Sequence, residues 1–418
     1  MNQNKKTSLI AGNQSNSRWR DILSLLLDRN FRGLWSAGLL QWTIFGIEAL
    51  ATSIYIFSLT ESPLLVTSLL AARMAPMIIL GSIAGALAER LPGIILLSLG
   101  YLTLAVVFFV LGTIYLLGTI ELWHIFLGAF FTGTGLTLDN TVRRKAIGEL
   151  AEGETLGTAM SLDISTLMLA MLLGPLVGGV IFEYAELSGA YFCIGVIFLI
   201  ALAVVRKTVL PTKDKHHEKT NLLGDIIEGI KYARSNRVVT AILVITIVMN
   251  IFVLALFGLV PVVGIDILHL KPSINGVLLA ASGTGGLIGA ILISIYGRYS
   301  QYKRYYLWGS ILLSVCILLF AFSTNFYTSL ALLIVGGFGL AGFGTMQVAL
   351  LLVETPAHLR ARILGLLTVC IGMGPVGVLH IGYMAEKFGM VVGLVTVGLE
   401  GALLLLATAV IWPELRKA

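Results

Sequence analysis

Twelve long apolar runs, separated by charges, prolines or polar clusters, dominate this chain. A helix that crosses a hydrocarbon core of about 30 Å needs roughly 20 apolar residues. The runs therefore predict an all-α integral membrane protein with twelve transmembrane helices. Their limits are Leu34–Phe57, Leu64–Ala88, Ile94–Leu117, Leu122–Thr141, Leu156–Phe182, Tyr191–Val205, Val238–Val262, Ile274–Gly297, Tyr305–Phe322, Tyr327–Val353, Ile363–Ala385 and Val391–Trp412.

The composition agrees with this prediction, since 57% of the 418 residues are hydrophobic and only 12% are charged. Lys and Arg (28) exceed Asp and Glu (22), but the basic residues lie mostly between the runs. This placement indicates membrane topology and not binding to nucleic acid. If the N-terminus is cytoplasmic, all basic residues except Arg73, Lys271 and Lys387 fall in cytoplasmic segments. We therefore expect both termini in the cytoplasm and the helices in the cell (inner or plasma) membrane.

The longest polar stretch, Arg206 to Arg237, divides the runs into two sets of six. The two sets show an internal repeat, because Gly174-Pro175 in the fifth run recurs as Gly374-Pro375 in the eleventh. Parallel repeats of this kind predict two pseudo-symmetric six-helix bundles with a substrate site between them. The predicted parts are a cytoplasmic N-terminal segment (1–33), an N-terminal bundle (34–205), a central cytoplasmic loop (206–237), a C-terminal bundle (238–412) and a cytoplasmic tail (413–418).

Signals for enzymatic or cofactor chemistry are weak. Cys193, Cys316 and Cys370 lie inside apolar runs without the spacing of zinc or redox sites, so we interpret them as packing residues. A dinucleotide-like glycine pattern at 337–342 also lies inside an apolar run, and the sequence has no phosphate-binding loop that would indicate an ATP motor. We therefore expect no cofactor, no metal and no enzymatic activity, and an ion gradient as the energy source.

Glu48 and Arg73 are ionisable residues inside predicted helices, where each costs several kcal/mol unless it is paired or faces water. Glu48 lies 9 residues before the end of the first run, and Arg73 lies 9 residues after the start of the second. At about 1.5 Å per residue, both sit roughly 14 Å deep on adjacent antiparallel helices, so an ion pair is feasible. Either Glu48 takes a proton or a cationic substrate when it is released from Arg73, or the pair is permanently structural.

A polar and aromatic stripe runs along the first predicted helix. Gln41, Phe45, Glu48, Thr52 and Tyr55 are spaced by 4, 3, 4 and 3 residues, which places them on one face. A lipid-facing helix would not need this face. We therefore expect the stripe to line the cavity between the bundles.

Other polar residues in the runs also need partners or water. Asp163 is a candidate cation or proton site, with pairing to Arg143 or Arg144 as the alternative. His124 and His380 titrate in the range that suits a proton relay, and hydrogen-bonded core histidines are the alternative. The remaining candidates are Asn250 and Gln347, as hydrogen-bond partners of a substrate, and Glu400 in the twelfth helix.

Three segments resemble the major facilitator superfamily. Gly85-Ala-Leu-Ala-Glu89-Arg90-Leu-Pro-Gly93 is similar to its loop signature between helices two and three, with Glu89 at the usual aspartate. The segment from Arg143 to Gly179 is similar to its antiporter signature. The segment from Leu359 to Gly389 is similar to helix eleven of the branch that includes macrolide-efflux proteins and enterobactin exporters.

This resemblance implies the major facilitator fold, alternating access and a cavity lined by helices 1, 4, 5, 7, 10 and 11. Close helix packing and matching bends in helices five and eleven are expected from Gly174, Pro175, Gly178, Gly179, Gly374 and Pro375. The resemblance also implies a cytoplasmic gate formed by Gly85, Glu89, Arg90, Arg143 and Arg144.

Together these features predict a secondary active transporter of the drug:proton antiporter type. We expect it to export a small amphipathic molecule, either an antibiotic or a siderophore, with protons as the coupling ion and Glu48 as the first candidate to carry them. Uptake of a nutrient or of an iron–siderophore chelate is the alternative, since alternating access is reversible. The expected partners are the lipid bilayer, the substrate and protons, with no nucleic acid, and the chain is expected to be a monomer.

Overall fold

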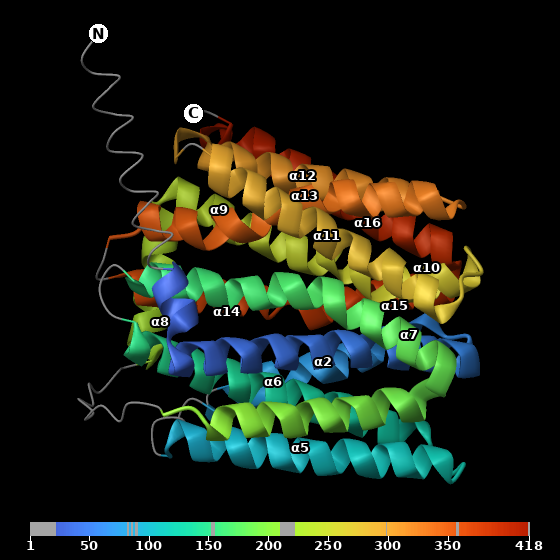
Figure 1. Cartoon of the computed structure of the whole chain (residues 1–418). Coiled ribbons are helices and arrows are strands. Elements are labelled where there is room, and N and C mark those ends of the chain that lie inside the picture. The colour runs from blue at the N-terminus through green and yellow to red at the C-terminus, as the bar shows by residue number, and fades with distance from the viewer. Residues whose placement is uncertain are drawn as a thin grey trace.

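The computed structural model describes residues 22–81, 83–84, 87, 91–151, 155–209, 222–297, 299–356 and 359–416 (Figure 1). Short π-helical (η1) and 3-10 (η2, η3, η5) segments accompany the α-helices. In chain order the elements are α2 (Arg29–Thr60), α3 (Pro63–Ile79), α5 (Gly93–Leu116), α6 (Leu122–Leu150), α7 (Thr155–Arg206), α8 (Leu222–Ser235), α9 (Arg237–Val248), η1 (Met249–Val253), η2 (Leu254–Leu259), α10 (Val260–Asp266), α11 (Pro272–Tyr296), η3 (Tyr299–Gln301), α12 (Tyr302–Phe320), α13 (Phe326–Glu354), α14 (Arg360–Ile371), α15 (Gly374–Phe388), α16 (Met390–Ile411) and η5 (Pro413–Leu415).

Polar residues between the apolar runs start several of these helices. The carboxylate of Asp28 accepts the N–H of Phe31 at 2.7 Å, and Ser62 caps α3, which begins with Pro63. Asn236 and Asn325 cap α9 and α13 in the same way. Side-chain oxygens at these positions satisfy N–H groups that have no partner inside the helix.

The described segments include nine that are long and apolar enough to cross a membrane. One of them belongs to the 52-residue α7, which bends at Glu186 (φ 53°, ψ −155°) and returns as a second antiparallel arm (Figure 1). A straight helix of that length would extend for about 78 Å, so the two arms correspond to the fifth and sixth predicted runs. The all-helical membrane fold is confirmed in the described part of the chain, whereas the count of twelve crossings stays a prediction.

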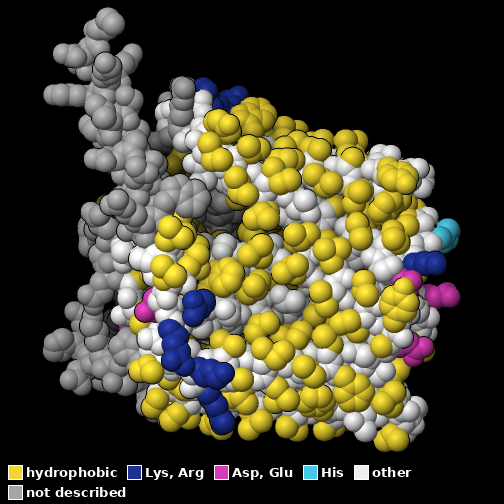
Figure 2. Space-filling view, viewed as in Figure 1, with side chains coloured by type: hydrophobic (Ala, Val, Ile, Leu, Met, Phe, Trp, Pro, Cys, Tyr) yellow, Lys and Arg dark blue, Asp and Glu magenta, His cyan; other side chains and the backbone are white. Residues whose placement is uncertain are grey.

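Apolar side chains on the outside of the bundle support a lipid environment. On α5, Leu99, Val106 and Val110 are each at least half exposed, while Tyr101 and Phe108 on the other face are buried. Contiguous apolar exposure of this kind marks an interaction surface. Figure 2 shows a broad apolar belt between two polar ends.

The two ends of the bundle differ in charge (Figure 2). Lys and Arg gather where α2 begins, α6 ends and α8 lies, and we call this the basic end. The opposite end, where α2 ends and α10 and α15 end, carries acidic side chains, and we call it the acidic end. The basic end is the predicted cytoplasmic end, because positive charge is retained on that side of a membrane.

The helices form two halves. The helices α2 to α7 occupy the lower part of Figure 1, and α9 to α13 together with α16 occupy the upper part. Within the halves, α7 packs on α2 and α5, and α13 packs on α11 and α12. Between the halves, α7 packs against α11, and α3 packs against α15. These two helix pairs form much of the interface between the halves.

Pro175 and Pro375 stand at different places in their helices, and the expected bend at Pro175 stays a prediction. The helix α7 continues through Pro175, whereas the eleventh helix is interrupted between Ile371 and Gly374, and Pro375 lies in the first turn of α15. A proline in the first helical turn needs no N–H partner, so Pro375 fits the start of a new helix. The seventh run is also interrupted, by η1 and η2, which the sequence did not predict. Breaks inside predicted runs therefore occur in both halves, because the second run is also interrupted, at Leu80 after α3.

Candidate functional site

Glu48 and Arg73 form a buried ion pair. The Nε of Arg73 lies 2.5 Å from Oε2 of Glu48, and the two side chains are 1% and 0% exposed. The residues come from α2 and α3, at the matched depth expected from the sequence. The predicted pair is therefore present, and its role in transport stays a prediction.

The guanidinium of Arg73 has more contacts with surrounding side chains than the carboxylate of Glu48 has. Arg73 Nη2 donates to the hydroxyl of Thr52 at 3.2 Å, and Arg73 Cζ lies 5.4 Å from the centre of the Phe45 ring. In contrast, Oε1 of Glu48 and the hydroxyl of Tyr191 are buried without a hydrogen-bond partner among the described residues. The site thus contains one carboxylate oxygen with unused acceptor capacity.

A close approach of α3 to α6 fixes the position of Arg73. A Cβ atom on Gly133 would overlap the backbone carbonyl oxygen of Arg73. Glycine therefore lets the two backbones meet at the residue that carries the charge. Small residues are the usual means of such contacts in membrane helices.

Replacing Gly133 with Ala is expected to lower the stability of the protein by roughly 1–3 kcal/mol, because the new methyl group must push α3 away. Gly100→Ala is the matched control, since its Cβ would meet nothing within 4 Å. Both changes bring the same gain in helix propensity, so thermal unfolding in detergent isolates the steric effect. Equal melting temperatures for the two variants would contradict the close contact.

A cavity of about 270 Å³ lies between the halves, next to the ion pair. Its walls come from α2, α3, α7, η2, α10 and α11. Aromatic and apolar side chains dominate, and among the described lining residues Arg73 is the charged one. Its larger lining side chains include Trp42, Phe45, Arg73, Met171, Leu254 and Phe257.

The polar stripe of the first helix faces differently from the expectation. Phe45 lines the cavity, but Gln41 and Thr52 are buried inside the first half. Gln41 lies against Gly135 of α6, and Tyr55 packs edge-on against Tyr115 of α5 at 5.5 Å. The prediction that the whole stripe lines the cavity is therefore wrong, because the neighbouring face of α2 does so.

A second buried network lies toward the basic end of the first half. The Nε of Arg143 lies 2.8 Å from Asp139, and Nη1 of the same residue pairs with Asp163. Tyr101 donates to Asp139 at 2.5 Å, and Arg144 approaches Asp163 at 3.4 Å. This network ties α5, α6 and α7 together, so Asp163 adopts the pairing that the sequence left open as the alternative.

Sequence reasoning missed Asp139 and Tyr101, which lie near the end of the fourth run and inside the third. Asp139 is four residues before Arg143, the spacing of an intrahelical ion pair, and this signal was available in the sequence. Arg143 is fully buried, and its guanidinium lies where a Cβ on Gly38 of α2 would be. The expected gating role of Arg143 stays a prediction, and in this structure the residue is part of a buried network.

The second half contains a polar cluster around Thr246. Gln347 donates to the Thr246 hydroxyl at 2.8 Å, and Tyr306 lies 3.1 Å from the same hydroxyl. Asn250 donates to the backbone carbonyl of Thr246 at 2.9 Å. The structure thus brings the predicted residues Asn250 and Gln347 together, but their amides bond to protein groups, and neither residue is among the described lining residues of the cavity.

The histidines lie apart from the ion pair. His380 on α15 contacts Glu400 on α16 at 2.9 Å, and both side chains are more than a third exposed. His124 accepts the N–H of Glu121 at 3.0 Å and stacks on Trp123 at the start of α6. His380 and Glu400 are therefore partners of each other within the second half. His124 caps the start of α6.

Of the expected gate, Gly85, Glu89 and Arg90 lie outside the described residues. The glycines of the fifth helix pack closely: Gly174 and Gly178 meet the backbone of α2, and Gly179 meets that of α11. Gly374 contacts the side chain of Met74 across the halves. Within the described ranges, no group of three or more His, Cys, Asp or Glu residues is placed to hold a metal ion.

Comparison with solved structures shows the fold. A mutant of the nucleoside transporter NupG has a TM-score of 0.70 at 14% identity, covering 93% of this chain and 100% of that one. The D-xylose–proton symporter gives 0.67 at 14%, covering 91% and 97%. A bacterial homologue of the iron transporter ferroportin, in the inward-facing state, gives 0.64 at 16%, covering 92% and 99%.

Sequence comparison identifies the family. The multidrug efflux pump Tap of Mycolicibacterium fortuitum is 26% identical over 300 residues, which cover 70% of this chain and 71% of that protein. The family described as transmembrane secretion effector matches residues 22–417. Since this match spans nearly the whole chain and the fold is that of known transporters, the chain belongs to the transmembrane secretion effector family and is a multi-pass membrane transporter of the major facilitator superfamily.

Proposed function

We propose that this protein exports a small amphipathic molecule from the cytoplasm by proton antiport, with Glu48 as the proton carrier. The observation that carries the proposal is the buried Glu48–Arg73 pair beside the cavity between the halves. Ionisable groups within a membrane are expensive and tend to be functional. The efflux activity in the name of the relative Tap supports the direction of transport.

The geometry suggests how the pair couples the two fluxes. One oxygen of Glu48 has no partner among the described residues, so a proton can add there once the charge contact with Arg73 weakens. Protonation neutralises Glu48 and leaves Arg73 without its counter-charge, at the wall of the cavity. A substrate in the cavity and a proton on Glu48 would then oppose each other, as antiport requires.

The lining of the cavity favours a lipophilic substrate. Trp42, Phe45, Met171 and Phe257 offer apolar and aromatic surface, and Arg73 is neutralised by its partner. Aromatic rings bind flat apolar or cationic groups well. A multiply charged chelator would lose its hydration here without an excess of opposite charge. Of the two predicted substrate classes, antibiotic and siderophore, we therefore propose a lipophilic antimicrobial compound.

Energised inside-out vesicles that contain a pH-sensitive dye provide the test. A macrolide or a cationic dye is expected to dissipate the proton gradient when the protein is present and not when Glu48 is replaced by Gln. Catecholate and carboxylate chelators are expected to have no effect. A response to the chelators alone would overturn the proposed substrate class, and accumulation of the compound inside intact cells would replace export with uptake.

A further inference from the structure

Two carboxylates at the acidic end connect the halves. Glu386 of α15 accepts the Ser62 hydroxyl at 2.8 Å and the N–H of Leu64 at 3.2 Å, both at the start of α3. Glu183 of α7 accepts the N–H of Ser273 at 3.0 Å, at the start of α11. Each acid therefore reaches from one half to the first turn of a helix in the other.

The two contacts are constructed alike. Both receiving helices begin with a proline, Pro63 or Pro272, and in both the second residue donates its N–H to the carboxylate. Four residues before each acid stands a glycine, and that glycine contacts the fifth residue of the receiving helix. These glycine contacts are Gly382 with Thr67 and Gly179 with Gly276.

The match follows the internal repeat of the fold. In each case the fifth helix of one half supplies the acid and the glycine, and the second helix of the other half receives them. Two unrelated surface contacts would have no reason to share this register. The same device is therefore present twice, on the two sides of the interface between the halves.

Helix N-termini stabilise nearby carboxylates. The first N–H groups of a helix have no partner within it, and the peptide dipoles place partial positive charge there. Hydrogen bonds to an ionised oxygen are stronger than those between neutral groups. Separation of the halves at the acidic end would break both contacts at once.

We propose that Glu183 and Glu386 are the paired latches that hold the acidic end of the transporter closed. They are positioning residues of the transport cycle, because neither lines the cavity next to the ion pair and because they set which end of that cavity is open. Without the latches, the equilibrium shifts toward the state that is open at the acidic end. The inference uses the transporter fold and is independent of the substrate and of Glu48.

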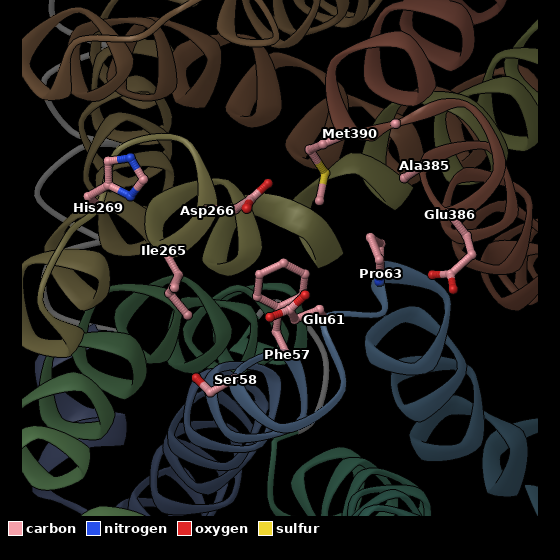
Figure 3. Close-up of a pocket in the computed structure, with 11 residues that line it drawn as sticks. Phe57, Ser58, Glu61, Pro63, Ile265, Asp266, His269, Ala385, Glu386 and Met390 are labelled. Atoms are coloured by element: carbon pink, nitrogen blue, oxygen red, sulfur yellow. The ribbon is translucent and has the colours of Figure 1, made fainter.

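Figure 3 shows the surroundings of one latch. Glu386 stands beside Pro63 at the rim of a cavity of about 480 Å³ that lies between the halves at the acidic end. Asp266, Glu61 and His269 line other sides of the same cavity. Glu386 itself is exposed at this rim.

A single cysteine in the cavity next to the ion pair can report the opening. Ser53 lines that cavity, and the reporter is Ser53→Cys in a chain whose Cys193, Cys316 and Cys370 are replaced by Ala. A membrane-impermeant maleimide is added to intact cells or to inverted vesicles. The parent is expected to be labelled mainly from the basic end.

Glu183→Ala and Glu386→Ala are each expected to raise the labelling rate from the acidic end roughly threefold to tenfold. The labelling rate from the basic end should fall. The double variant is expected to multiply the two effects, because the contacts are separate. Glu183→Gln and Glu386→Gln remove the charge but nearly keep the side-chain volume, and their labelling rates are compared with the parent in the same way.

Glu121→Ala is the matched control, because this acidic-end carboxylate accepts from Trp123 of its own half at 2.9 Å. Its labelling is expected to equal that of the parent. Unchanged accessibility in both latch variants would overturn the proposal. A rise from both ends would overturn it as well, since that result means general loosening instead of a shift between states.

Discussion

Replacing Glu48 with Gln is expected to abolish proton-coupled export while the protein remains in the membrane. The amide cannot carry the proton, and Arg73, which is 2% exposed, loses its counter-charge. Breaking one side of a buried ion pair costs about 3–5 kcal/mol, so the melting temperature should fall as well. Substrate-induced proton movement in vesicles and thermal unfolding in detergent measure the two effects separately.

The double variant Glu48→Gln, Arg73→Gln separates coupling from structure. Removal of both charges leaves no unpaired ion, and buried pairs replaced by neutral residues are often about as stable as the original. We expect the double variant to regain most of the lost stability without regaining coupling. Normal transport by the double variant would show that the pair is only structural.

Replacing Arg143 with Ala is expected to have the largest effect on stability. Asp139 and Asp163 both depend on its guanidinium, and all three side chains are almost completely buried. Two buried carboxylates would remain without their main partner, which should cost about 3–5 kcal/mol or more. Thermal unfolding in detergent, followed by size-exclusion chromatography, measures the loss.

Arg144→Ala provides the comparison on the same helix. Its side chain is 56% exposed and approaches Asp163 only to 3.4 Å. Exposed ion pairs contribute about 0–1 kcal/mol, so the melting temperature should stay close to that of the parent. Equal losses in the Arg143 and Arg144 variants would show that burial does not decide the strength of this network.

The ion pair between Glu48 and Arg73 could be predicted because it depends only on the positions of the two residues along adjacent helices. Depth in a membrane is set by the distance along a helix, and the two residues lie equally far from the ends of adjacent runs. The network around Arg143 was harder to predict, because Asp139 lies beside polar residues at the end of its run. This buried network also needs Asp163 and Tyr101, which come from other helices.

The orientation of the first helix could not be predicted from the sequence. A spacing of 3 and 4 residues correctly places Gln41, Glu48 and Thr52 on one face, but it does not say what that face meets. In the fold this face turns into the first half, and the adjacent face with Phe45 and Ser53 meets the cavity. A polar face can be satisfied by neighbouring helices as well as by water.

The sequence by itself determined the apolar helices, the division into two halves and the matched positions of Glu48 and Arg73 along adjacent helices, because these depend on hydrophobicity and rise along one chain. Only the tertiary structure decided which helix faces meet, where the eleventh helix is interrupted and which acids join the halves. Glu183 and Glu386 look like ordinary acids in the sequence. They become partners of Ser273 and Leu64 only because the halves bring helices from distant parts of the chain together.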